Sequence, residues 1–203
     1  MDQRTLVGQA QRGDHDAFAT LVRERIVRLD AAARLILRDA ELARDAIQEA
    51  LVRAWKDLPG LRDPERFDAW LHRLMTHACI DAARARRRRV LEIELSPDDG
   101  PRTNDPSMLV ADRDLIDRAL ARLQPDAQAL VVLVHYLGLT VPAAADALGI
   151  PLGSAKSRLS RTLVAMRATA DSDRPGARTA MEERPHRLWS GWRHLGRAAV
   201  GWR

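Results

Sequence analysis

Hydroxyl and cationic side chains recur at helical spacing over residues 149–161, which read GIPLGSAKSRLSR. Short hydroxyl side chains let a helix approach base-pair edges closely, and arginine can bond guanine with two hydrogen bonds. Gly149 allows a tight turn, and Thr140 can cap the helix that precedes the turn. The segment is therefore typical of the recognition helix of a helix–turn–helix, with five candidate DNA contacts: Ser154, Lys156, Ser157, Arg158 and Arg161.

An ordinary helical hairpin with a solvated polar face is the alternative interpretation of residues 140–163. The small Ala145 stands where a second helix must approach, and Ala155, Leu159, Leu163 and Met166 share one helical face. This arrangement is more specific than a run of charges, so we favour DNA binding.

A second basic cluster ends the expected helix over residues 66–88, which finishes in RARRRR. Like charges on neighbouring residues repel one another unless an anion lies close. Beside the proline- and glycine-containing segment 57–65, such a helix end could hold DNA through its phosphates. A basic patch that only keeps the protein in solution is the alternative.

The expected helix over residues 41–56 carries Asp45, Gln48, Glu49 and Arg53 on one face, opposite an apolar stripe. From the residues alone this face is most simply a solvated surface. The rest of the chain shows no nucleophile elbow, phosphate loop or zincin motif, and the single Cys79 excludes an internal disulfide and a cysteine-based zinc site. We therefore expect no enzymatic activity, cofactor, metal site or small-molecule substrate.

These candidate residues must be positioned by helices. In the 203 residues Ala, Leu, Arg, Asp and Glu dominate, and strand-forming runs are scarce. We predict an all-α fold of two small helical domains, the second a helix–turn–helix domain, joined by a flexible linker. The expected domain bounds are 1–95 and 108–170, with the linker at 96–107 and a basic tail at 171–203. Helices are expected over 2–12, 17–38, 41–56, 66–88, 109–123, 126–137, 141–148 and 154–169.

The overall charge and hydropathy indicate which class of partner and which cellular compartment to expect. The net charge is +5, and the basic side chains are almost all arginine, which suits a polyanionic partner. The N-terminus has no apolar core of a signal peptide, and no run approaches 18 apolar residues. We therefore expect a soluble, cytoplasmic protein.

Two blocks resemble a known family. The segments DAELARDAIQEALVRAW and FDAWLHRLMTHACIDAARARRRR resemble region 2 of the extracytoplasmic-function (group 4) sigma factors of bacterial RNA polymerase. The segment ALARLQPDAQALVVLVHYLGLTVPAAADALGIPLGSAKSRLSR resembles their region 4. Both blocks occur in the family's order, with the linker between them.

The resemblance implies a transcription initiation factor that binds core RNA polymerase, directs it to a promoter and helps to open the duplex. It implies that Asp45, Gln48, Glu49 and Arg53 dock on the clamp helices of the β′ subunit, while the β subunit is a further contact. Segment 57–65 would capture a flipped base of the −10 element, and region 4 would bind the −35 element as duplex. The implied −10 contacts are Arg62, His77, Asp81, Arg84, Arg87 and Arg88.

The sequence departs from the family pattern at three places. His77 stands where the family usually has asparagine, Gln128 replaces a common arginine, and TVPAAADAL lacks the usual glutamate. These departures bear on which promoter is read and leave the general role unchanged. Many family members are held by an anti-sigma factor, which adds such a protein as a candidate partner.

The tail 171–203 lies outside the resemblance. Leu188, Trp192, Leu195 and Ala199 share a helical face ringed by arginines, which would suit a membrane surface, a protein partner or DNA; a largely disordered basic extension is the alternative. For the whole chain, a stand-alone helix–turn–helix regulator is the alternative to a sigma factor. Such a regulator would bind its operator unaided and would not need the docking helix.

Overall fold

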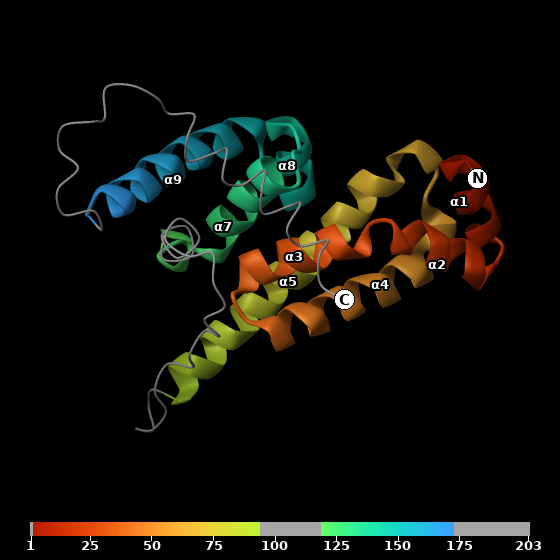
Figure 1. The fold of residues 1–203 in the computed structure, drawn as a ribbon, viewed down its shortest axis with the longest axis horizontal. Helices are drawn as coiled ribbons and strands as arrows, with labels where there is room; N and C mark the ends of the chain where they lie inside the picture. The colour runs from red at the N-terminus through yellow and green to blue at the C-terminus, as the bar shows by residue number, and fades with distance from the viewer. Residues whose placement is uncertain (1, 94–118, 173–203) are drawn as a thin grey trace.

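The computed structural model of the chain describes residues 2–93 and 119–172 (Figure 1). The predicted linker, the start of the helix expected at 109–123, and the tail fall outside the described residues. Within the described ranges every regular element is a helix or a helical turn, and none is a strand. The predicted all-α class is confirmed.

The N-terminal region consists of five α-helices: α1 (Gln3–Gln11), α2 (His15–Arg23), α3 (Ile26–Leu37), α4 (Ala40–Asp57) and α5 (Phe67–Ile93). Two of them begin at aspartate caps. The Asp14 carboxylate accepts hydrogen bonds from the amides of Asp16 and Ala17, and Asp39 does the same at α4. Each cap satisfies N–H groups that have no partner within the helix.

One helix of the prediction is divided in the structure. The continuous helix expected at 17–38 is wrong, because α2 ends at Arg23 and α3 begins at Ile26. The side chain of Arg25 explains the break. Its guanidinium donates to the carbonyl of Leu21 at 2.8 Å, while its own amide donates to Val22. The regular bond from residue i to residue i−4 is therefore replaced at this point.

The proline- and glycine-containing segment 57–65 and the residue after it form two short 3-10 turns, η1 (Leu58–Gly60) and η2 (Pro64–Arg66). The carboxylate of Asp63 accepts from the amide of Glu65 at 3.0 Å and caps the second turn. The segment is thus a structured connection that leads directly into α5.

The C-terminal region contains α7 (Pro125–Val131), the π-helical segment η3 (Val132–Tyr136), α8 (Val141–Leu148) and α9 (Leu152–Ser172). The predicted turn between α8 and α9 is confirmed: Thr140 caps α8, and Gly149 adopts the left-handed conformation with φ of 65°. Helix α9 begins two residues before the predicted start, so Ser154 lies within its first turn.

The two regions pack on each other, which the sequence did not predict. Helix α8 lies against α5, and α7 contacts both α3 and α5 (Figure 1). A single hydrophobic core contains Leu29, Ile36 and Met75 from the N-terminal region together with Leu133 and Ala144 from the C-terminal region. Burying apolar surface between the regions stabilises this arrangement.

Polar side chains from each region also reach backbone carbonyls of the other. Gln128 is buried and donates from Nε2 to the carbonyl of Leu35 at 2.8 Å. Arg28 donates from Nη2 to the carbonyl of Leu137 at 3.1 Å. Gln128, one of the three departures from the resemblance, thus joins the two regions. These directional bonds fix the register of the apolar contact.

Candidate nucleic-acid and protein interfaces

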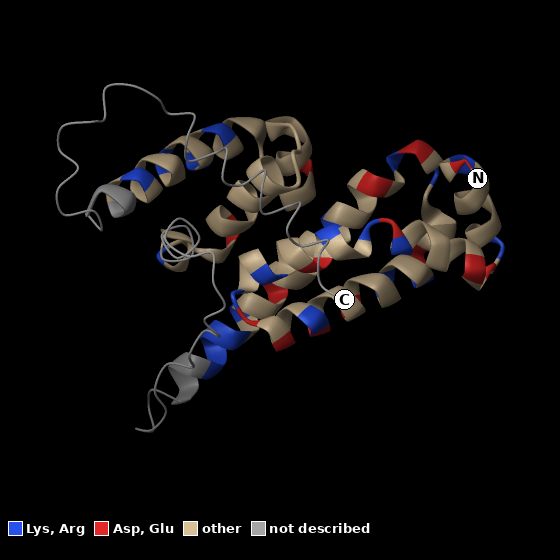
Figure 2. Ribbon diagram, viewed as in Figure 1, with Lys and Arg blue, Asp and Glu red and all other residues tan. Residues whose placement is uncertain are grey.

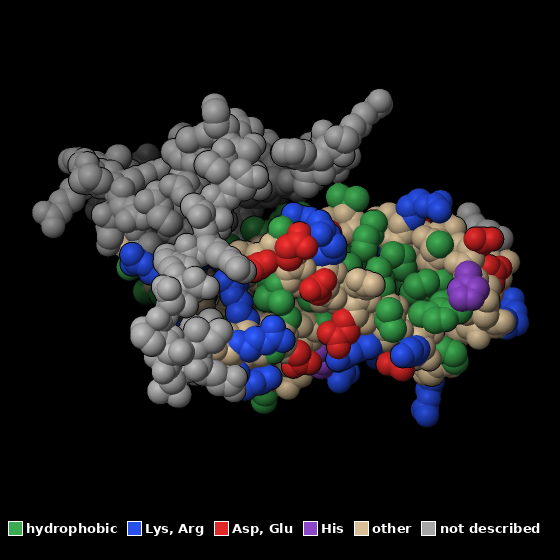
Figure 3. Space-filling view, turned by 90° about the horizontal axis from the view of Figure 1, so that it is seen from below, with side chains coloured by type: hydrophobic (Ala, Val, Ile, Leu, Met, Phe, Trp, Pro, Cys, Tyr) green, Lys and Arg blue, Asp and Glu red, His purple; other side chains and the backbone are tan. Residues whose placement is uncertain are grey.

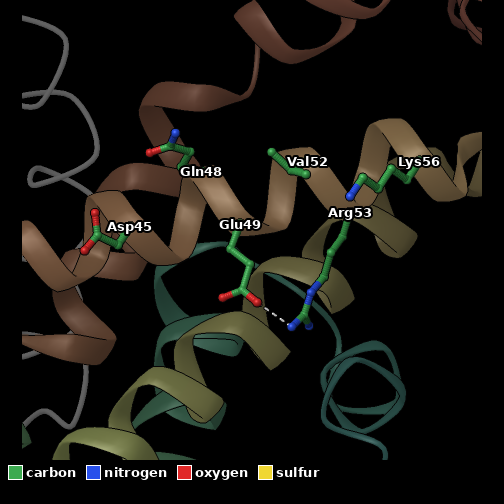
Figure 4. A pocket seen from close by; sticks show the side chains of 6 residues that line it. All are labelled: Asp45, Gln48, Glu49, Val52, Arg53 and Lys56. Carbon is green, nitrogen blue, oxygen red and sulfur yellow. Dashed lines mark hydrogen bonds and ion pairs between the residues drawn. The ribbon is translucent and has the colours of Figure 1, made fainter.

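The predicted docking residues form a continuous polar strip along α4 (Figure 4). Asp45, Gln48 and Glu49 are exposed, and Arg53 is half-buried. The Arg53 guanidinium lies 2.5 Å from Glu49 Oε1, an i to i+4 pair along the helix. With the apolar side of the helix in the core, these side chains are left available to another molecule.

Two residues that the sequence analysis did not name complete this strip. Asp45, Gln48, Glu49, Arg53, Val52 and Lys56 together line a shallow hollow. Val52 keeps 48% of its surface exposed although it is apolar. Figure 3 shows this side of the molecule, where hydrophobic side chains gather next to acidic and basic ones. The spacing of residues 45, 48, 49, 52, 53 and 56 is one helical face, so the signal was present in the sequence.

The five predicted −35 contacts come from successive turns of α9, along which Figure 2 shows basic residues in blue. Lys156, Ser157 and Arg161 are exposed, and Ser154 and Arg158 are half-buried. Ala155 is fully buried on the opposite side, and Thr162 is buried as well. The helix is thus seated on its apolar side and presents its polar side outward, as a recognition helix requires.

Arg161 is held loosely in the free chain. Its Nε lies 3.3 Å from the carbonyl oxygen of Ser157, and its Nη2 lies 3.4 Å from Ser157 Oγ. Both distances are long for hydrogen bonds, so little is lost when the guanidinium turns to another acceptor.

The predicted −10 contacts lie on α5 and on the connection before it. His77, Asp81, Arg84 and Arg88 recur every three or four residues and share one face of α5, with His77 half-buried and the others exposed. Arg62 is exposed on the connection that precedes α5. The part of α5 between its first residue, Phe67, and Arg84 is about 25 Å long at 1.5 Å per residue, and it separates Arg62 from Arg84. The structure therefore arranges these residues along a line and does not gather them in one pocket.

Two of the −10 candidates contact the C-terminal region. Arg84 Nη2 lies 3.3 Å from Asp126 Oδ1, and Arg87 Nη1 donates to Gln124 Oε1 at 2.5 Å. The other carboxylate oxygen of Asp126 lies 3.9 Å from Nη1 of Arg158 on α9. Asp126 thus stands between one candidate from each DNA-binding set, a contact that no local sequence pattern indicates.

Burial shifts the pKa of several ionisable side chains. Desolvation raises the pKa of the Cys79 thiol to about 12, which makes it a poor nucleophile. Burial lowers the pKa of His72, an effect that Arg28 and Arg25 reinforce and Asp68 opposes. Burial also lowers the pKa of His135 in η3. These shifts are structural consequences of packing, and neither histidine belongs to the candidate interfaces.

Neither a metal site nor a membrane span emerges from the described ranges. No group of three His, Cys, Asp or Glu residues there could hold a metal ion. Within residues 2–93 and 119–172, no helix is both long and apolar enough to cross a membrane.

Family models match both regions of the chain. Residues 21–89 match sigma-70 region 2, and residues 113–166 match sigma-70 region 4. The paired helical regions thus define the class as a sigma factor, a protein of transcription initiation. Because the first match begins at residue 21, helix α1 lies outside it.

Comparison with individual sigma factors shows to which subgroup of this class the chain belongs. The chain is 34% identical over 150 residues to the ECF RNA polymerase sigma factor SigM of Mycobacterium tuberculosis, covering 73% of this chain and 74% of the relative. It is 33% identical over 170 residues to the RNA polymerase sigma-E factor of Streptomyces avermitilis, covering 84% and 94%. A solved structure of CnrH in complex with the cytosolic domain of CnrY has a TM-score of 0.64 and 28% identity, covering 85% of this chain and all of that one. The chain belongs to the extracytoplasmic-function sigma factors.

Proposed function

We propose that this sigma factor divides its work among three surfaces. The polar strip of α4, made of Asp45, Gln48, Glu49, Val52, Arg53 and Lys56, docks on the clamp helices of the β′ subunit of core polymerase. Helix α9 binds the −35 element, and α5 with the connection Leu58–Arg66 binds the −10 element. The domains are 1–95 and 108–170, joined by residues 96–107, and the protein acts in the cytoplasm beside the polymerase.

One observation carries this proposal: a single chain presents both an exposed polar strip on α4 and a helix–turn–helix whose second helix presents cations and hydroxyls outward. A stand-alone helix–turn–helix regulator has no use for the strip. Its operator binding would depend on the second region alone. The family membership agrees with the role of an initiation factor.

The two promoter elements call for different chemistry. A duplex element is read through hydrogen bonds and apolar contacts at groove edges, which suits Arg161 and the serines of α9. An opened element is read by taking bases out of the stack, and unstacking costs a few kcal/mol per base. A site that binds the extruded base offsets this cost. Opening can then proceed by binding alone, without hydrolysis and without a cofactor.

In the solved structure that contains CnrH, this sigma factor is in complex with the cytosolic domain of CnrY. We extend this relationship to the present chain as a proposal: a partner protein that acts as an anti-sigma factor binds it and restrains it. Because the two regions pack on each other, a partner that contacts both of them would bind them as one continuous surface.

The test is a pull-down with core polymerase together with run-off transcription from start sites mapped after overexpression. We expect the purified chain to bind core and to direct initiation at discrete promoters. Tight, specific binding of an operator by the chain alone, without core binding, would instead support the stand-alone regulator. Failure to bind core, with promoters silent when the chain is added, would rule out the proposed function.

A further inference from the structure

Side chains of α1 hold the connection between α4 and α5 through its backbone carbonyls. Gln11 Nε2 lies 3.1 Å from the carbonyl oxygen of Leu58 and 2.7 Å from that of Leu61. Gln3 Nε2 donates to the carbonyl of Pro64 at 3.0 Å. Helix α1 also packs against both 3-10 turns of the connection. Three carbonyls of one short connection therefore take donors from one distant helix.

The chemistry of the primary amide explains why glutamine suits this position. Its nitrogen carries two hydrogens, so one Gln11 side chain can serve two carbonyls at once. The amide of Leu61 donates to the carbonyl of Leu58 at 3.0 Å and closes the first turn. Gln11 therefore joins the first and last carbonyls of that turn, and the shape of the turn depends on a donor from outside it.

Helix α1 is itself firmly placed. Leu6, Val7 and Ala10 are buried in the hydrophobic core. Gln3 Oε1 accepts from Arg25 Nη2 at 2.6 Å, and Arg25 Nε also lies 2.5 Å from Asp68 Oδ1 in the first turn of α5. The connection is thus fastened to a rigid unit at both of its turns. The exposed pair of Arg4 and Glu65, at 3.5 Å, adds little to this.

We propose that Gln11, supported by Gln3, is a positioning residue that orders the connection Leu58–Arg66 before it receives an extruded promoter base. This inference rests on the proposed function, in which the connection captures that base. A loop that is already ordered spends less of its binding free energy on its own ordering, so more remains to offset unstacking. The family match begins at residue 21 and covers neither glutamine.

Three variants of the full chain separate hydrogen bonding from packing. Gln11→Met keeps a side chain of similar size and removes the donors. Gln11→Lys keeps donors at the end of a flexible chain. Gln9→Met is the matched control, because side chains two residues apart on a helix point to nearly opposite sides.

The first readout is hydrogen exchange in the free chain. In Gln11→Met we expect the Leu61 amide to exchange on the order of tenfold faster, since two hydrogen bonds to the connection are lost. Gln9→Met should exchange like the wild type, and Gln11→Lys should restore most of the protection.

The second readout is promoter opening by the variant bound to core polymerase, followed with 2-aminopurine in place of the base that is extruded. We expect Gln11→Met to lower the rate of opening about three- to tenfold, from the loss of two hydrogen bonds. Binding to core and to a −35 duplex should stay unchanged, and Gln11→Lys should recover the fluorescence signal. A merely structural defect would lower all three activities together.

The inference is overturned if Gln11→Met opens promoters like Gln9→Met, if it loses core and −35 binding to the same degree, or if Gln11→Lys fails as Gln11→Met does. A failure of the proposed function is distinct from these outcomes. In that case the wild-type chain itself would not support run-off transcription with core polymerase.

Discussion

The two candidate DNA-binding surfaces are built in different ways. In the C-terminal region all five candidate contacts lie within two turns of α9, on a helix seated by Ala155 and Thr162. In the N-terminal region the candidates extend from Arg62 on the connection to Arg88 near the end of α5. The first surface is a local property of one helix, and the second depends on how several elements are held together. Substitutions in α9 should therefore affect single contacts with DNA. Substitutions around α5 should also change how the elements of the candidate −10 surface are held together.

The largest effect is expected at the strip on α4, which in the proposed function carries both candidate DNA-binding surfaces to the promoter with the polymerase. Charge reversal at Asp45 and Glu49 should lower the affinity for core polymerase by about 2–5 kcal/mol, because repulsive charges then face the partner. Helicity should be unchanged, since the exposed pair of Glu49 with Arg53 contributes about 0.2–1 kcal/mol. Titration with labelled core and circular dichroism measure the two quantities.

Charge reversal at Glu24 and Asp146, two exposed acids away from the strip, is the matched control for net charge. Core affinity equal to that of the control would contradict the docking role of the α4 strip.

The local nature of the α9 surface is tested at Arg161. Arg161→Ala should weaken binding to the −35 element by about 1–3 kcal/mol, the range for a lost base contact, and should relax the preference at one base pair. The profile of single-base −35 variants measured with the holoenzyme checks this. Arg167→Ala, an exposed arginine further along α9, is the control. An unchanged profile for Arg161→Ala would remove that residue from the interface.

The contact between the two surfaces is tested at Asp126, which faces Arg84 and Arg158. Asp126→Asn should favour separation of the regions by about 0.2–1 kcal/mol, the range for exposed ion pairs. Energy transfer between dyes at Arg12→Cys and Val164→Cys measures the separation. Native Cys79 is buried with a raised thiol pKa, so the introduced exposed thiols react first.

Asp146→Asn changes the same charge on α8 and is the control for Asp126→Asn. Equal energy transfer in the two variants would show that Asp126 does not help to hold the regions together.

The smallest effect is expected from pH. The pKa of both His72 and His135 is lowered from 6.5 by burial, so the unfolded chain binds these protons at higher pH than the folded one. Their contribution to stability is complete above pH 6.5 and is lost as the pH falls through the folded values. Urea unfolding at pH 7.5 and 5.5 should therefore show lower stability at the acidic pH.

Each region holds one of these histidines. His72→Gln and His135→Gln should therefore each remove part of the difference in unfolding free energy between pH 7.5 and 5.5. A pH dependence equal to that of the wild type in both variants would assign it to other groups.

Much of the fold was predictable because its signals are local. The caps at Asp14, Asp39 and Thr140 and the turn at Gly149 follow from side-chain and backbone preferences within a few residues. The break between α2 and α3 was not predicted: the guanidinium of Arg25 binds the carbonyl of Leu21, and the distant Gln3 and Asp68 hold the same side chain. Helical periodicity continues through that position and gives no sign of it.

By itself, the sequence determined the helical class, the helix–turn–helix and the residues that α4, α5 and α9 present outward. These follow from periodicity, capping and charge, which act within one or two turns of a helix. Only the tertiary structure decided that α8 packs on α5, that Gln128 binds the carbonyl of Leu35, and that Gln11 holds the connection before α5. The reason is physical: backbone carbonyls look alike in every sequence, and which distant donor reaches one of them is settled only when the core has packed.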